Sequence, residues 1–210
     1  SQYGLTELPC LEKAGLIWVT IDPKSTLDIT LFLSGYDELL THFGFEKWHH
    51  FASQVVEGPN WKIAYDGYLD LYHLPILHKD TFGSNFPNQA IYYSWGPHQR
   101  VAGPMKGMAK MLGDSEEDWP TEYLTAGVWT IFPHISIAGF DGGGRSVMLS
   151  QLFPGETPGT SYTVQHYLMA EEPKDEATVK AARDQLDFLR YVVAEEDYAT
   201  GLKQQKAMET

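Results

Sequence analysis

Residues 60–80 read NWKIAYDGYLDLYHLPILHKD, and this stretch concentrates the side chains best suited to chemistry. It contains Asp70, His73 and His78 in the pattern D-x2-H-x4-H. Imidazole nitrogens and carboxylate oxygens are common ligands of catalytic transition metals. Two histidines at this spacing also arise by chance, so the surrounding sequence has to support a metal site.

The local sequence can bring the two imidazoles together. Residues 61–73 are predicted to be helical, and Asp70 and His73 would then share one helix face at i, i+3. On an unbroken helix His78 would point about 140° away from His73. Pro75 removes a backbone donor and disfavours helical geometry at the residue before it. We therefore expect the helix to break between the histidines, so that both face one ion.

A third ligand is predicted near the C-terminal end. Residues 174–208 contain no proline and one glycine, and apolar residues recur at a spacing of three or four, which predicts a long amphipathic helix. Placing Val193 at 0° puts Leu189 at about −40° and Asp197 at about +40°, inside the apolar stripe. A carboxylate there is costly unless it is paired or metal-bound. Asp197 is therefore the best third ligand, although a frayed or bent helix would leave it exposed.

The composition excludes several classes of protein. The chain has 210 residues, 43% of them hydrophobic, which is enough to build the core of one domain. It has 28 acidic against 15 basic residues, so nucleic acids and anionic membranes are poor partners. Cys10 is the only cysteine, which excludes a disulfide framework and fits a cytoplasmic protein. Neither a membrane span nor a signal peptide is expected, and the opening residues read like the middle of a longer protein.

The pattern of apolar residues predicts an antiparallel sheet. Segments rich in β-branched and aromatic residues alternate with turns rich in glycine and proline, as expected for strands joined by hairpins. With the C-terminal helix, these segments predict an α+β domain. The predicted strands are residues 47–56, 91–101, 123–132, 135–140, 146–153 and 161–169.

Several of these motifs together resemble the catalytic domain of Rieske non-haem iron oxygenases, the large α subunits of aromatic-ring-hydroxylating dioxygenases. They are the Asn60-Trp61 pair that opens a helix, the D-x2-H-x4-H pattern, and Glu196-Asp197 in a C-terminal helix. GLIWVTIDP (15–23) resembles the end of the Rieske domain, and WTIFPHISI (129–137) is also similar. The resemblance covers nearly the whole chain.

The resemblance implies a helix-grip (START-like) fold. Residues 24–210 would form the mononuclear iron domain, and residues 1–23 would be a remnant of the end of the Rieske domain with a linker strand. His73, His78 and Asp197 would hold one Fe(II), and Asp70 would act in catalysis by bridging to the Rieske cluster of a neighbouring subunit.

The resemblance also implies partners. The [2Fe-2S] Rieske cluster needs two cysteines and two histidines, so Cys10 alone cannot hold it. We expect the cluster in a missing N-terminal domain, and we expect the fragment to be inactive alone. The partners would be O2, a small aromatic or hydrophobic substrate, and a ferredoxin or reductase as electron donor. The assembly would be a homotrimer, with or without a β subunit.

The predicted pocket departs from the family pattern at one point. Several aromatic-ring dioxygenases have Asn-Phe seven and six residues before the first histidine ligand, where this chain has Asp66-Gly67. Asp66 would add an acid to the pocket and Gly67 would enlarge it, unless both face away from the substrate. The other predicted pocket residues, each of which could instead be structural, are Leu74, His134, Leu189 and Val193.

Two other functions stay open at this stage. A non-enzymatic ligand-binding domain of the same architecture would keep the cavity, but it would not need two histidines and an inward aspartate. A zinc hydrolase could use two histidines and a carboxylate, but no HExxH motif or other obvious glutamate base lies beside these ligands. The metal that the protein binds would separate the three possibilities.

Overall fold

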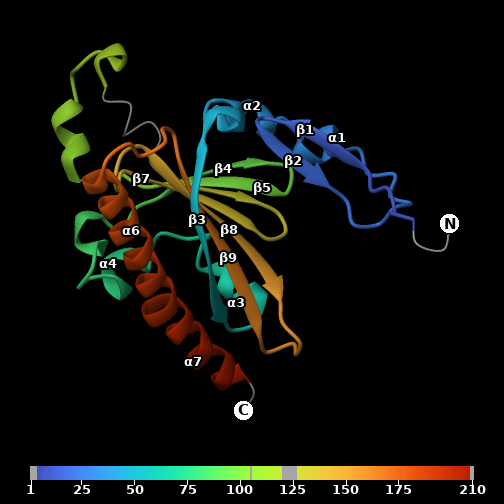
Figure 1. The fold of residues 1–210 in the computed structure, drawn as a ribbon. Helices are drawn as coiled ribbons and strands as arrows, with labels where there is room; N and C mark the ends of the chain where they lie inside the picture. The colour runs from blue at the N-terminus through green and yellow to red at the C-terminus, as the bar shows by residue number, and fades with distance from the viewer. Residues whose placement is uncertain (1–3, 105, 120–126, 209–210) are drawn as a thin grey trace.

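A seven-stranded antiparallel sheet and one long helix that packs across it form most of the protein (Figure 1). The structure is a computed structural model, and it describes residues 4–104, 106–119 and 127–208. The predicted α+β fold, an antiparallel sheet packed around a long C-terminal helix, is confirmed. Among the residues described, no helix is long and apolar enough to cross a membrane.

The sheet has the order β3-β9-β8-β7-β6-β5-β4. Strands β4 to β9 follow one another as a meander, and β3 joins the sheet beside β9 with a bulge at Phe51. The strands are β3 (His49–Gly58), β4 (Ile91–Trp95), β5 (His98–Ala102), β6 (Val128–Ile131), β7 (Ile135–Phe140), β8 (Ser146–Pro154) and β9 (Ser161–Met169).

Two predicted strand segments differ from the structure by more than two residues at an end or in the number of strands. Residues 91–101 form two strands, because Gly96 and Pro97 turn the chain back between Trp95 and His98. Gly96 has a φ of 54°, a conformation that glycine adopts readily. In the segment 123–132, strand β6 starts at Val128, and residues 123–126 lie outside the described part of the chain.

The predicted C-terminal helix is continuous but not uniform. Helix α6 (Glu176–Tyr191) starts after Asp175, whose carboxylate accepts the Thr178 N–H at 2.7 Å. A π-helical turn, η5 (Val192–Tyr198), follows, and α7 (Ala199–Met208) continues from it. The buried residues that join α6 to the sheet are Met148, Tyr167, Met169, Ala182, Leu186 and Leu189.

The N-terminal residues form a small layer against β6, β7 and β8. Strands β1 (Cys10–Lys13) and β2 (Leu16–Val19) make a hairpin, and α1 (Ile29–Leu33), α2 (Tyr36–Thr41) and the 3-10 turn η1 (Phe45–Lys47) follow. Leu16 and Trp18 of the hairpin pack on a buried cluster of Tyr36, Leu40, Phe43, Phe45, Trp129, Ile131, Ile137 and Val147. The boundary at residue 23 stays a prediction.

The segment between β3 and β4 lies beside the long helix and carries the two histidines (Figure 1). It contains α3 (Trp61–Asp66), α4 (Leu74–Leu77) and the 3-10 turn η2 (Gly83–Asn85). Two further 3-10 turns, η3 (Lys106–Met111) and η4 (Glu116–Asp118), follow β5. The fold thus places residues 70–80 opposite η5.

Candidate metal centre

The backbone before the first histidine differs from the predicted helix over residues 61–73. Helix α3 starts after Asn60, whose side chain accepts the backbone N–H of Lys62 at 2.9 Å, and it ends at Asp66. The Asp70 carboxylate then accepts the Tyr72 N–H at 2.9 Å. Aspartate competes in this way with the helical hydrogen-bond pattern, and it favours a turn. The prediction of one helix up to His73 is therefore wrong.

Pro75 also acts differently from the prediction. It lies in the first turn of α4, where a missing N–H costs no helical hydrogen bond. His73 directly precedes α4 and His78 directly follows it. The two imidazoles therefore approach one another from opposite ends of a short helix, with ring centroids 5.1 Å apart.

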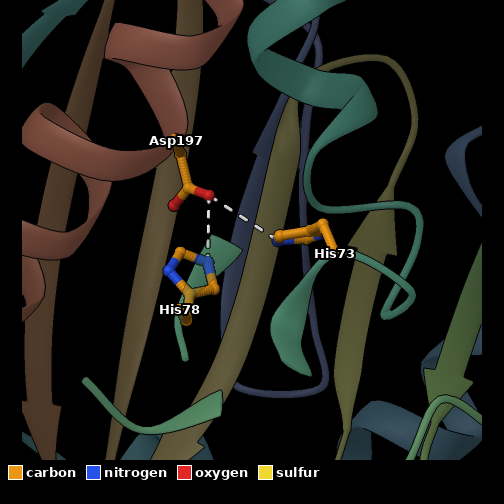
Figure 2. A group of neighbouring side chains, drawn as sticks. All are labelled: His73, His78 and Asp197. Carbon is orange, nitrogen blue, oxygen red and sulfur yellow. Dashed lines mark ion pairs between the residues drawn. The ribbon is translucent and has the colours of Figure 1, made fainter. Parts of the chain in front are cut away.

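Asp197 meets both imidazoles from the long helix (Figure 2). Its Oδ1 lies 3.1 Å from Nε2 of His78 and 3.6 Å from Nε2 of His73. Possible ligand atoms of the three residues all lie within 4.8 Å of one another. His78 is buried, whereas His73 and Asp197 are half-buried, so the group lies at the edge of the core.

Two further carboxylates fix the orientation of the rings. Asp70 Oδ1 lies 3.0 Å from Nδ1 of His73, and Glu196 Oε2 lies 2.6 Å from Nδ1 of His78. An ionised carboxylate can only accept a hydrogen bond, so each Nδ1 donates. In the neutral imidazole the lone pair is then on Nε2, which is the atom that faces Asp197.

This arrangement fits a metal ion. Two imidazole lone pairs and one carboxylate oxygen point into the same small space, and they repel one another unless a cation lies between them. Carboxylate-supported histidines with a further carboxylate ligand are a common donor set for divalent transition metals. The described residues therefore form a candidate mononuclear metal site.

A proton can fill part of this space when no metal is bound. Burial opposes a positive charge on His78, but the hydrogen bonds and charges of Asp197 and Glu196 outweigh it. Together they raise the pKa of His78 above its ordinary value. The buried imidazole is thus surrounded by groups that favour a cation.

The π-helical turn η5 contains both of the carboxylates that contact His78. Its residue Glu195 is exposed, while Glu196 and Asp197 are half-buried. Such turns hold one extra residue within a helix and occur frequently at functional sites. The predicted angles assumed a regular α-helix, but they agree with the structure in placing Asp197 inward and Glu195 outward.

Sequence reasoning did not assign a role to Glu196. A signal for it exists, because Glu196 lies at about −60° on the same helical projection, near the edge of the apolar stripe. In the structure Glu196 also accepts a hydrogen bond from the Thr81 hydroxyl at 3.1 Å. Thr81 therefore helps to orient the Glu196 carboxylate, which in turn fixes the ring of His78.

Comparison with known proteins identifies the family. The sequence profile of the ring-hydroxylating alpha subunit (catalytic domain) matches residues 45–210. The chain belongs to this family. The resemblance to Rieske oxygenases in the sequence is thereby confirmed.

Solved structures with the same fold include a quaternary ammonium Rieske monooxygenase described for carnitine oxidation by gut microbiota and inter-subunit electron transfer. The TM-score is 0.73 at 18% identity, over 97% of this chain and 53% of that one. The monooxygenase CntA in complex with L-carnitine matches with a TM-score of 0.72 at 16% identity, over 97% and 51%. This chain thus spans about half the length of these proteins. No curated protein sequence matches it.

A mainly apolar cavity of about 500 Å³ adjoins the three candidate ligands. Among the predicted pocket residues, Gly67, Leu74, Leu189 and Val193 line this cavity. Tyr68 and Tyr198, which the sequence analysis did not single out, line it next to Asp197. Burial raises the pKa of both tyrosines, so their hydroxyls stay neutral beside this carboxylate.

Two predicted pocket residues lie elsewhere in the described structure. Asp66 is the last residue of α3, and its side chain is exposed rather than directed into the cavity. His134 precedes β7 and packs against the ring of Phe153, with centroids 5.4 Å apart. Neither side chain lines this cavity, and a role for them in substrate binding stays a prediction.

Proposed function

We propose that this domain inserts oxygen from O2 into a small, mainly apolar organic substrate at a mononuclear Fe(II) site held by His73, His78 and Asp197. The observation that carries the proposal is the convergence of two Nε2 atoms and one carboxylate oxygen beside an apolar cavity. These three side chains would hold ferrous iron beside the cavity, and the bound iron would supply the activation of O2.

The chain's own residues prepare the site. Asp70 and Glu196 hold the imidazoles in the tautomer that directs both Nε2 atoms inward. Leu74, Leu189 and Val193 form an apolar wall that excludes water and holds the substrate near the ligands. The substrate is therefore oriented by packing rather than by a dense set of polar contacts.

We further propose that electrons reach the site from outside these residues. Asp70 is partly exposed, and exposed aromatic rings lie beside it, with Tyr72 and Tyr92 centroids 6.4 Å apart. This surface, at the edge strand β4, would bind a second copy of the chain in a homotrimer and bring a Rieske cluster close to Asp70. Ferredoxin or a reductase would supply the electrons. The inter-subunit electron transfer described for the quaternary ammonium monooxygenase supports this arrangement.

Asp70→Asn tests this route in the complete enzyme. The amide keeps the shape of the side chain but loses its charge, so iron should stay bound while product formation falls by roughly one to two orders of magnitude. Iron content and product are measured on the same sample. Near-normal turnover would contradict the bridging role, and loss of iron would mean that Asp70 is itself a ligand.

Anaerobic titration with ferrous iron tests the metal site. The protein should bind about one iron per chain, and His73→Ala and His78→Ala should each abolish binding, because two ligands hold Fe(II) poorly against water. The exposed His42→Ala is the control, and circular dichroism checks that each variant folds. Tight binding of zinc together with hydrolytic activity would favour a zinc hydrolase. Binding of no metal would favour a non-enzymatic ligand-binding domain.

A further inference from the structure

One end of the cavity is charged, and the proposed oxygenase reaction does not use this end. The hairpin between β7 and β8 has the sequence DGGGR (141–145), and Asp141 and Arg145 both line the cavity. Both side chains are exposed, so the cavity reaches solvent here. Among the described residues that line the cavity, Arg145 is the only lysine or arginine.

The backbone of this hairpin is firmly held. Tyr167 donates a hydrogen bond from its hydroxyl to the Gly142 carbonyl at 2.9 Å, and Ala170 N–H donates to the Arg145 carbonyl at 2.9 Å. Gly143 has a φ of 80°, and a Cβ there would lie 2.8 Å from the Thr178 carbonyl oxygen in α6. The turn therefore packs directly on the long helix, and the start of the Arg145 side chain is fixed.

The ring of Trp48 also positions the guanidinium group of Arg145. This group lies over the ring of Trp48, 5.3 Å from the centroid, and the indole N–H of Trp48 donates to the Phe43 carbonyl at 2.8 Å. Stacking uses the flat face of a guanidinium and leaves its N–H edge available. Within the described part of the chain Arg145 forms no ion pair, not even with Asp141 on the same hairpin.

We propose that Arg145 binds a carboxylate of the substrate, whose apolar, ring-containing body extends along the cavity toward His73 and His78. This inference rests on the proposed function and deepens it by naming the substrate class, an apolar carboxylic acid. A planar carboxylate matches the two parallel N–H groups of a guanidinium edge, and such charged hydrogen bonds are strong. Because Trp48 lines the same end of the cavity, its ring can also contact the body of the substrate.

Calorimetric titration of the protein with three matched probes tests the inference. They are naphthalene-2-carboxylate, naphthalene-2-carboxamide and the 2-naphthyl-trimethylammonium ion, which share one ring system and differ in charge. We expect the carboxylate to bind roughly tenfold more tightly than the amide, the factor for one charged hydrogen bond. Arg145→Gln should remove this preference and leave the amide's affinity unchanged, which also shows that the cavity is intact.

Asp141→Asn is the matched control on the same hairpin, and it should keep the preference for the carboxylate. Equal affinity of wild type for carboxylate and amide, or no binding of the carboxylate, would overturn the inference. So would tightest binding of the trimethylammonium probe with loss of that binding in Asp141→Asn, which would assign the subsite to a cation. Titration of the same samples with ferrous iron is an independent measurement. Iron binding without a preference for the carboxylate would refute this inference alone. A preference for the carboxylate without iron binding would refute the proposed function.

Discussion

Adjacent residues contact opposite edges of one imidazole at the candidate metal centre. Glu196 lies 2.6 Å from Nδ1 of His78, and Asp197 lies 3.1 Å from its Nε2. The ring is therefore fixed from both sides by one turn of helix, while Phe82 stacks on its face with centroids 4.8 Å apart. His78 has little freedom to rotate away from the position in which it would bind a metal.

Glu196 should therefore tune metal affinity without binding the metal. Glu196→Ala removes the acceptor for the His78 N–H, and we expect ferrous iron to bind about 10- to 100-fold more weakly, the usual effect of losing such a partner. Glu196→Gln keeps an acceptor oxygen, so its affinity for ferrous iron should fall less. Competition with a coloured chelator under anaerobic conditions measures the iron affinity of both variants. The exposed neighbour Glu195→Ala is the control, and equal effects of the two alanine variants would contradict this role.

His98 should make stability depend on pH. It is 1% exposed, it donates from Nε2 to the Phe32 carbonyl at 2.9 Å, and its Nδ1 accepts the Phe132 N–H at 3.2 Å. Burial lowers its pKa, so the folded protein resists protonation more than the unfolded chain does. As pH falls below about 6.5 the unfolded chain takes up the proton first, so the contribution of His98 to the free energy of unfolding should fall toward pH 5.

Urea unfolding at pH 7.5 and pH 5 measures this loss. His98→Gln should be less stable at both pH values but should show a smaller difference between them. His42→Gln, at an exposed histidine, should keep the wild-type difference. An unchanged difference in His98→Gln would rule out His98 as the source.

At the scale of elements, η5 sets the position of the carboxylates within the long helix. A π-helical turn behaves like one residue inserted into an α-helix, so α6 and α7 can keep their packing if one residue is removed. Deleting the exposed Glu195 should leave a regular helix, move Glu196 and Asp197 away from His78, and abolish iron binding. Circular dichroism and iron titration check both parts. Iron binding at wild-type strength would show that the turn is not needed.

The elements show how far the sequence could predict the structure. Strands β7 and β9 have the predicted bounds, because alternating β-branched residues between turns fix them locally. The predicted helix over residues 61–73 ends at Asp66, and further along the Asp70 carboxylate accepts the Tyr72 N–H, which a longer helix would pair with a backbone carbonyl. The apolar periodicity does not reveal the π-helical turn, and the contact of Arg145 with the Trp48 ring joins two residues that are far apart in the sequence. The three candidate ligands could be proposed from the sequence because the spacing of His73 and His78 and the position of Asp197 within the apolar stripe are local properties.

At the scale of the whole molecule, the chain should bind iron but not complete the reaction alone. Cys10 is its only cysteine, so it cannot supply the thiolates of a [2Fe-2S] cluster. Reconstituted with ferrous iron, it should show about one iron per chain, no cluster absorption, and no multiple turnover with a reduced nicotinamide, a reductase and O2. Adding a Rieske domain should restore turnover. Repeated hydroxylation by the chain alone would show a different source of electrons.

The three candidate ligands come from two segments that are far apart in the chain, the ends of α4 and the turn η5. A metal bound between them would act as a crosslink that closes a loop of more than a hundred residues, and its binding energy would add to the stability of the fold. Loss of iron would then do more than stop the reaction. The short segment around α4 could then detach from the long helix. Oxidation and loss of the iron would therefore expose this segment to proteolysis.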